Sequence, residues 1–157
     1  MTNLQVKLEK LVNDAIGKFN KYEHYLLVED LSERCICSKL ATYIERMLSK
    51  YEFEDKYDVD VEYNRMAGDE KRERSIDGKI KRMFADIIVH ERDEKDNLIC
   101  IEMKKQKNPE CLCKDRHRLK EMTKQSGDYG YKIGFLIMVN NTDMWIEETF
   151  VDGQKRP

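Results

Sequence analysis

The chain has 157 residues, a length typical of one domain rather than two. Its 29 Lys and Arg residues nearly balance its 31 Asp and Glu residues, so a uniformly basic nucleic-acid coat is excluded, although a local basic face is not. No apolar run approaches the roughly 18 residues of a membrane span, and the charged N-terminus lacks a signal-peptide pattern. We therefore expect a cytoplasmic protein without a membrane partner.

Two amphipathic helices are predicted in the first third of the chain. Residues 1–22 carry apolar side chains at helical spacing, namely Leu4, Leu8, Leu11, Val12, Ala15, Ile16 and Phe19. This stripe would cover a sheet or form a dimer contact. Asp30 or Ser32 is expected to cap a second helix that runs to about Ser49. Glu33 lies in its first turn, where the helix dipole alone would also favour a carboxylate.

Five cysteines, an odd number, fit reduced thiols better than a disulfide framework. Four of them form the Cys-x-Cys pairs Cys35/Cys37 and Cys111/Cys113. A zinc site is an alternative, but zinc modules use wider spacing, and residues two apart on a helix do not share a face. We expect ordinary thiols.

The middle of the chain predicts three strands and one long loop. Residues 59–64 alternate apolar and polar side chains, as a half-exposed strand does. The charged, glycine-containing segment 66–82 lacks periodicity and is expected to be a mobile loop, which could form a flap over a site. Residues 84–90 and 97–105 have the apolar runs of buried strands, joined by a connection of hairpin length.

The remaining elements are a helix and two strands. The helix is expected to begin at Cys111 or Asp115 and to end near Ser126, and residues 132–139 have the continuous apolarity of a strand buried on both faces. Residues 144–150 could form a final edge strand. A helix between successive strands indicates a crossover, so the fold class is α/β, a mixed sheet with helices against both faces.

Ionisable residues interrupt two of these apolar strands. Asp86 lies in the strand at 84–90, and Glu102 and Lys104 lie in the strand at 97–105. Residues two apart on a strand share a face, so Glu102 and Lys104 point the same way, and Asp86 joins them if the strands pair. Buried charges are normally paired or bound to a metal. The cluster is therefore either a salt-bridge cluster or a site for a divalent cation.

Asp86, followed on the next strand by Glu102-Met103-Lys104, resembles the PD-(D/E)xK motif of restriction-endonuclease-like nucleases. Ala85 stands where that superfamily usually has proline. Glu33 matches the acidic residue that many members carry on a helix ahead of the sheet. The order helix, three strands, helix, strand matches the core of the superfamily over roughly residues 30–139. Residues 1–22 are then an extra N-terminal helix of a single domain, 1–157, which is similar to an uncharacterised microbial or mobile-element group.

The resemblance implies a metal-dependent phosphodiesterase or endonuclease, a hydrolase. Asp86, Glu102 and the backbone carbonyl of Met103 would bind Mg²⁺ or Mn²⁺, for which oxygen ligands are suited. Lys104 would act on the attacking water or on the phosphate, and Glu33 would hold a metal-bound water or a second metal. Gln125 resembles a glutamine that some relatives place beside the active site.

The expected partner is nucleic acid, DNA in preference to RNA. Its phosphates would be contacted by basic residues on the strand end, the following helix and the long loop: Lys105, Lys107, Arg116, Arg118, Lys79, Lys81 and Arg82. The alternative is a solvated, charge-balanced surface, and with it a catalytically idle nucleic-acid-binding or assembly module on the same fold. The sequence leaves open a homodimer, and also other subunits of a multi-component system.

Overall fold

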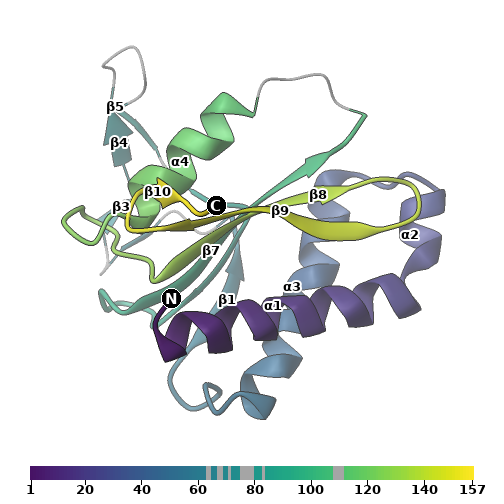
Figure 1. The fold of residues 1–157 in the computed structure, drawn as a ribbon, viewed down its shortest axis with the longest axis horizontal. Helices are drawn as coiled ribbons and strands as arrows, with labels where there is room; N and C mark the ends of the chain where they lie inside the picture. The colour runs from purple at the N-terminus through teal and green to yellow at the C-terminus, as the bar shows by residue number, and fades with distance from the viewer. Residues whose placement is uncertain (63–64, 67–68, 71, 75–79, 83, 108–111) are drawn as a thin grey trace.

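The computed structural model of the chain describes residues 1–62, 84–107 and 112–157, together with the backbone of 65–66, 69–70, 72–74 and 80–82. Three helices, α1 (Asn3–Tyr22), α2 (His24–Val28) and α3 (Glu33–Lys50), precede the sheet (Figure 1). The five-residue α2 is not among the predicted elements.

Local side-chain hydrogen bonds determine where the two long helices begin. The Thr2 hydroxyl accepts from the backbone N–H of Gln5, and the Gln5 side chain accepts from the N–H of Thr2, which is a capping box. Ser32 caps α3 by accepting from the N–H of Cys35. Of the two predicted caps, Ser32 is therefore the correct one, and the Asp30 carboxylate is instead paired with Lys105 and Lys107.

One six-stranded mixed sheet forms the centre of the fold. Its order is β1 (Asp58–Val61), β6 (Ile87–His90), β7 (Asn97–Lys105), β8 (Ile133–Val139), β9 (Met144–Val151) and β10 (Gln154–Lys155). Neighbours are antiparallel except β7 and β8, which are parallel and are connected through α4 (Cys113–Thr123). The α/β class and the mixed sheet predicted from the sequence are confirmed.

One prediction about an individual strand is wrong. β9 is not the edge of the sheet, because the two-residue β10 pairs with its end. In segment 66–82, which the sequence predicts to be a mobile loop, the described residues belong to two short antiparallel pairs: β2 (Arg65–Met66) pairs with β3 (Asp69–Glu70), and β4 (Arg72–Arg74) pairs with β5 (Ile80–Arg82). Residues 67–68, 71 and 75–79, which also fall within the predicted mobile loop, lie outside the described residues.

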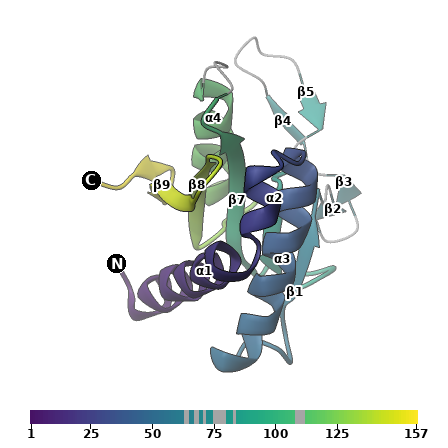
Figure 2. The same ribbon diagram turned by 90° about the vertical axis from the view of Figure 1, so that its right-hand side faces the viewer.

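Helices cover both faces of the sheet, as predicted. On one face, α1 packs against β8 and β9, and α3 packs against β1 and β7 (Figure 2), in a core that includes Leu11, Ile44, Ile101 and Phe135. On the other face, α4 packs through Leu119 and Met122 against Ile88, Cys100 and Leu136.

The apolar stripe of α1 is packed within the chain. Leu8, Leu11, Val12, Ala15 and Phe19 are all fully buried there. Asn20, near the end of α1, exchanges two hydrogen bonds with the backbone of Met144 at the start of β9. Of the two predicted uses of this stripe, it thus serves to cover the sheet. None of the helices in the described part of the chain is both long and apolar enough to cross a membrane.

Candidate functional site

The register of the β6–β7 hairpin brings Asp86 and Glu102 side by side. Ile87 pairs with Ile101 in antiparallel fashion, so Asp86, immediately before β6, lies opposite Glu102. Directly opposed residues of an antiparallel pair project to the same face. The predicted convergence of these two carboxylates therefore occurs. Lys104, two residues along β7, is half-buried on this same face.

Glu102 is the most deeply buried acid of the cluster. Its residue is 2% exposed, and its Oε2 accepts a hydrogen bond of 2.6 Å from Nη1 of Arg118 on α4. The other oxygen, Oε1, is buried and has no hydrogen-bond partner in the described part of the chain. Burial and the charge of Asp86 raise the pKa of Glu102 well above its ordinary value, and Arg118 offsets only part of this rise.

Asp86 is hydrogen-bonded both to β7 and to the residue that follows β1. Its Oδ2 accepts the backbone N–H of Met103 at 2.7 Å, and its own carbonyl accepts the N–H of Glu62 at 3.1 Å. Burial raises the pKa of the Asp86 carboxyl, although the Met103 N–H and the Arg118 charge favour its ionised form. Two neighbouring acids therefore both prefer the neutral form more than usual, as expected for negative charge in a partly dry site.

Glu33 is placed at the same edge of β7 by α3. Its Oε2 accepts the backbone N–H of Lys105 at 3.0 Å. Met103 and Lys105 are alternate residues whose N–H groups point to the side where β6 no longer pairs with β7. Asp86 and Glu33 thus satisfy two otherwise unpaired strand-edge donors. The carbonyl of Met103 points to the same side as its N–H, toward Asp86.

The structure adds one acid that sequence analysis missed. Asp115 on α4 is 9% exposed, and its charge acts on Asp86, Glu102 and Arg118. Asp115 and Arg118 are three residues apart on one helix, a spacing that places them on one face and could have signalled the pair.

Gln125 is not brought to this cluster. Its Nε2 donates to the carbonyls of Thr123 and Tyr131, both at 2.9 Å. Lys132, next to Tyr131, donates its N–H to the carbonyl of Asn97 at the start of β7. Asn97 lies five residues before Glu102 on this strand, which is about 17 Å at a rise of roughly 3.4 Å per residue. Gln125 supports the turn before β8.

The basic residues predicted to contact nucleic acid are engaged within the chain where the structure describes their side chains. Lys105 and Lys107 both pair with Asp30, and Arg116 binds Glu148 on β9 with a shortest distance of 2.7 Å. Arg118 binds Glu102. Lys79 and the side chains of Lys81 and Arg82 lie outside the described residues. Contact of any of these residues with nucleic acid stays a prediction.

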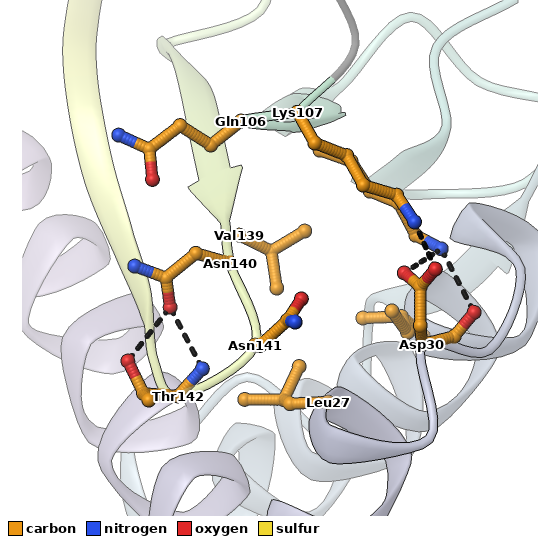
Figure 3. A pocket seen from close by; sticks show the side chains of 10 residues that line it. Leu27, Asp30, Gln106, Lys107, Val139, Asn140, Asn141 and Thr142 are labelled. Carbon is orange, nitrogen blue, oxygen red and sulfur yellow. Dashed lines mark hydrogen bonds and ion pairs between the residues drawn. The ribbon is translucent and has the colours of Figure 1, made fainter.

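A pocket of about 380 Å³ is lined by residues of α2, of α3, of the end of β7 and of the segment that follows β8 (Figure 3). Leu27, Ile36 and Val139 form its apolar part. The Lys105 and Lys107 ammonium groups meet Asp30 along one wall. Because successive strand residues alternate faces, Lys105 lines this pocket while Lys104 faces the acidic cluster.

The cysteines do not form a metal site in the described chain. Cys35 is exposed, whereas Cys37 is buried, with its Sγ 3.5 Å from Sδ of Met103. Burial, then the charges of Asp86, Glu33 and Glu102, raise the pKa of the Cys37 thiol, which keeps it neutral. Cys111 lies outside the described residues.

The donor set of the acidic cluster suits a hard cation. Asp86, Glu102 and the Met103 carbonyl offer oxygen atoms, and Oε1 of Glu102 is a buried acceptor without a hydrogen-bond donor in the described chain. Within the described residues, however, no three His, Cys, Asp or Glu side chains are gathered closely enough to hold a metal ion by themselves. Any cation here would therefore depend on the carbonyl and on water for part of its coordination.

No protein-family model matches this chain, and no curated protein matches its sequence.

Proposed function

We propose that this protein is a divalent-metal-dependent nuclease that hydrolyses phosphodiester bonds, with DNA as the expected substrate. The observation that carries the proposal is the side-by-side placement of Asp86 and Glu102, with Lys104 on the same face of β7. The succession α3, β1, β6, β7, α4, β8 supports it, because the PD-(D/E)xK resemblance implies this order of elements.

Each residue has a role that its position allows. Asp86, Oε1 of Glu102 and the Met103 carbonyl would hold Mg²⁺ or Mn²⁺, and the cation would supply Lewis-acid activation and neutralisation of phosphate charge. Lys104, a donor two residues beyond Glu102, would orient the attacking water and stabilise the charge that develops on the phosphate. Glu33 would position the edge of β7 through Lys105.

A cleavage assay tests this function directly. Wild type, Asp86→Asn and Lys104→Ala are each incubated with Mg²⁺ or Mn²⁺. The substrates are linear duplex DNA, circular DNA, single-stranded DNA and RNA. We expect cleavage that needs the cation and that falls at least about 10²-fold in either variant, the magnitude typical of losing one group that stabilises the transition state. Glu148→Gln is the matched control, because Glu148 is another buried acid bound by an arginine of α4. Cleavage that persists in Asp86→Asn would contradict the assignment.

The catalytically idle module remains the second candidate. It is favoured by the engagement of Lys105, Lys107, Arg116 and Arg118 in internal ion pairs, and by the lack of a ready three-residue metal group in the described chain. Calorimetry that detects no Mg²⁺ or Mn²⁺ binding, together with no cleavage of any substrate, would establish it over the nuclease.

A further inference from the structure

Arg118 hydrogen-bonds only one of the two carboxylate oxygens of Glu102. Its Nη1 binds Oε2 at 2.6 Å, while Oε1 stays buried with no hydrogen-bond donor in the described chain. The side chain of Arg118 is 27% exposed and that of Glu102 is 2% exposed, so the arginine is the outer partner and Glu102 the inner one. The carboxylate of Glu102 thus has one oxygen fixed by a hydrogen bond and one buried acceptor oxygen that Arg118 leaves open.

Charge at the cluster is not balanced by Arg118 alone. Asp86, Glu102, Asp115 and Glu33 have a combined formal charge of −4 when all are ionised, and Arg118 contributes +1, which leaves −3 before Lys104 is counted. A divalent cation can therefore enter without the departure of Arg118. The guanidinium and the cation would bind opposite oxygens of the same carboxylate.

We propose that Arg118 is a positioning residue for Glu102: by holding Oε2, it presents Oε1 beside Asp86 as the ligand for a divalent cation. This inference rests on the proposed function. It assigns Arg118 a role at the metal site instead of the contact with nucleic-acid phosphate that the sequence predicts. Carboxylates that bind metals are commonly fixed by an outer hydrogen bond, and losing such a partner typically weakens metal binding by about 10- to 100-fold.

The inference is tested by measuring how tightly the metal-free protein binds Mn²⁺ at pH 8, by calorimetry and by electron paramagnetic resonance. Neither measurement depends on cleavage activity. Arg118→Met keeps an apolar stem and removes every donor, and we expect it to weaken Mn²⁺ binding by about 10- to 100-fold. Simple electrostatics makes the opposite prediction, because removing a positive charge near a cation site should tighten binding. The direction of the change therefore separates positioning from net charge.

Two further variants make the test specific. Arg118→Lys keeps the charge but offers a different donor geometry, so we expect a smaller but measurable loss of Mn²⁺ affinity; if Arg118→Met does not fold, this variant decides. Arg116→Met is the matched control: it lies two residues earlier on α4 and breaks the Arg116–Glu148 pair, and it should leave Mn²⁺ affinity unchanged.

The outcomes distinguish this inference from the proposed function. Weaker binding in Arg118→Met with partial retention in Arg118→Lys supports it. If wild type binds Mn²⁺ and the Arg118 variants bind it equally tightly or more tightly, the positioning role is overturned. The metal-dependent function then stays in place. A wild type that binds no Mn²⁺ overturns both.

Discussion

At the scale of single residues, the two acids bound by arginines of α4 have pKa values that are shifted in opposite directions. Glu148 accepts three hydrogen bonds from Arg116 and one from Lys155, and the Arg116 contact in particular lowers the pKa of Glu148. Glu102 accepts one hydrogen bond from Arg118, and burial and Asp86 raise the pKa of Glu102. The first pair is a satisfied structural ion pair, whereas the second leaves excess negative charge that a cation would compensate.

This difference predicts a pH dependence of stability. Between the unfolded-state pKa of glutamate, about 4.3, and the raised folded-state value, the folded protein holds a proton on Glu102 that the unfolded chain has released. Stability therefore falls as pH rises across this window. We expect the unfolding free energy of metal-free wild type to fall with rising pH relative to Glu102→Gln, which has no such proton. Urea denaturation from pH 4.5 to 8 in chelator measures the difference.

Added Mn²⁺ provides the complementary check. At pH 8, saturating Mn²⁺ should stabilise wild type through its preferential binding to the folded state, and Glu102→Gln much less. In the metal-free pH series, the unfolding free energies of wild type and Glu102→Gln should differ by an amount that changes with pH. A difference that stays constant from pH 4.5 to 8 would contradict the raised pKa of Glu102.

At the scale of elements, the position of Arg118 depends on how closely α4 packs on the sheet. A Cβ built at Gly134 of β8 would lie 2.9 Å from Cγ2 of Thr123 and 3.1 Å from Sγ of Cys100. The Thr123 hydroxyl also donates to the Leu119 carbonyl and accepts the N–H of Gly153, which fixes the end of α4. Gly134 thus allows the close approach that brings Arg118 to Glu102.

Gly134→Ala is expected to lower stability by about 1–3 kcal/mol, because the added methyl group overpacks the contact between β8 and α4. Gly17→Ala is the matched control, since a Cβ there meets no atom within 4 Å and alanine favours the interior of α1 by about 1 kcal/mol. Chemical denaturation of both variants measures these changes. An unchanged or higher stability of Gly134→Ala would show that the contact relaxes without cost.

At the scale of the whole molecule, each of the four predicted nucleic-acid contacts whose side chain is described, Lys105, Lys107, Arg116 and Arg118, is paired with an acid of the same chain. The net charge is −2, and Asp30 binds both Lys105 and Lys107 near the end of β7. Binding of nucleic acid by these lysines would require the phosphate to replace Asp30 as their partner.

Asp30→Asn should therefore increase the affinity for DNA at low salt and steepen its salt dependence, because released lysines can neutralise phosphates, each adding roughly 0.9 to the slope of log K against log salt. Fluorescence anisotropy from 50 to 200 mM NaCl, in chelator to prevent cleavage, measures both quantities. Asp14→Asn, which releases Lys50 between α1 and α3, controls for the change in net charge. Equal effects of the two substitutions would exclude a specific role for Lys105 and Lys107.

The sequence by itself determined the main elements and the central acids. Helical spacing predicted α1 and α3, and apolar runs predicted β6, β7 and β8, because periodicity reports the local environment of the backbone. Asp86, Glu102 and Lys104 were identifiable because charge is rare within such runs.

The tertiary structure alone decided the partners of these residues. It joined Arg118 and Asp115 to the acidic cluster, assigned Gln125 to a turn, and paired Lys105 and Lys107 with Asp30. Ion pairs of this kind connect residues 16 to 77 positions apart in the chain, as in Arg118–Glu102 and Lys107–Asp30. Such pairs depend on how helices pack on the sheet, which periodicity along the sequence does not specify.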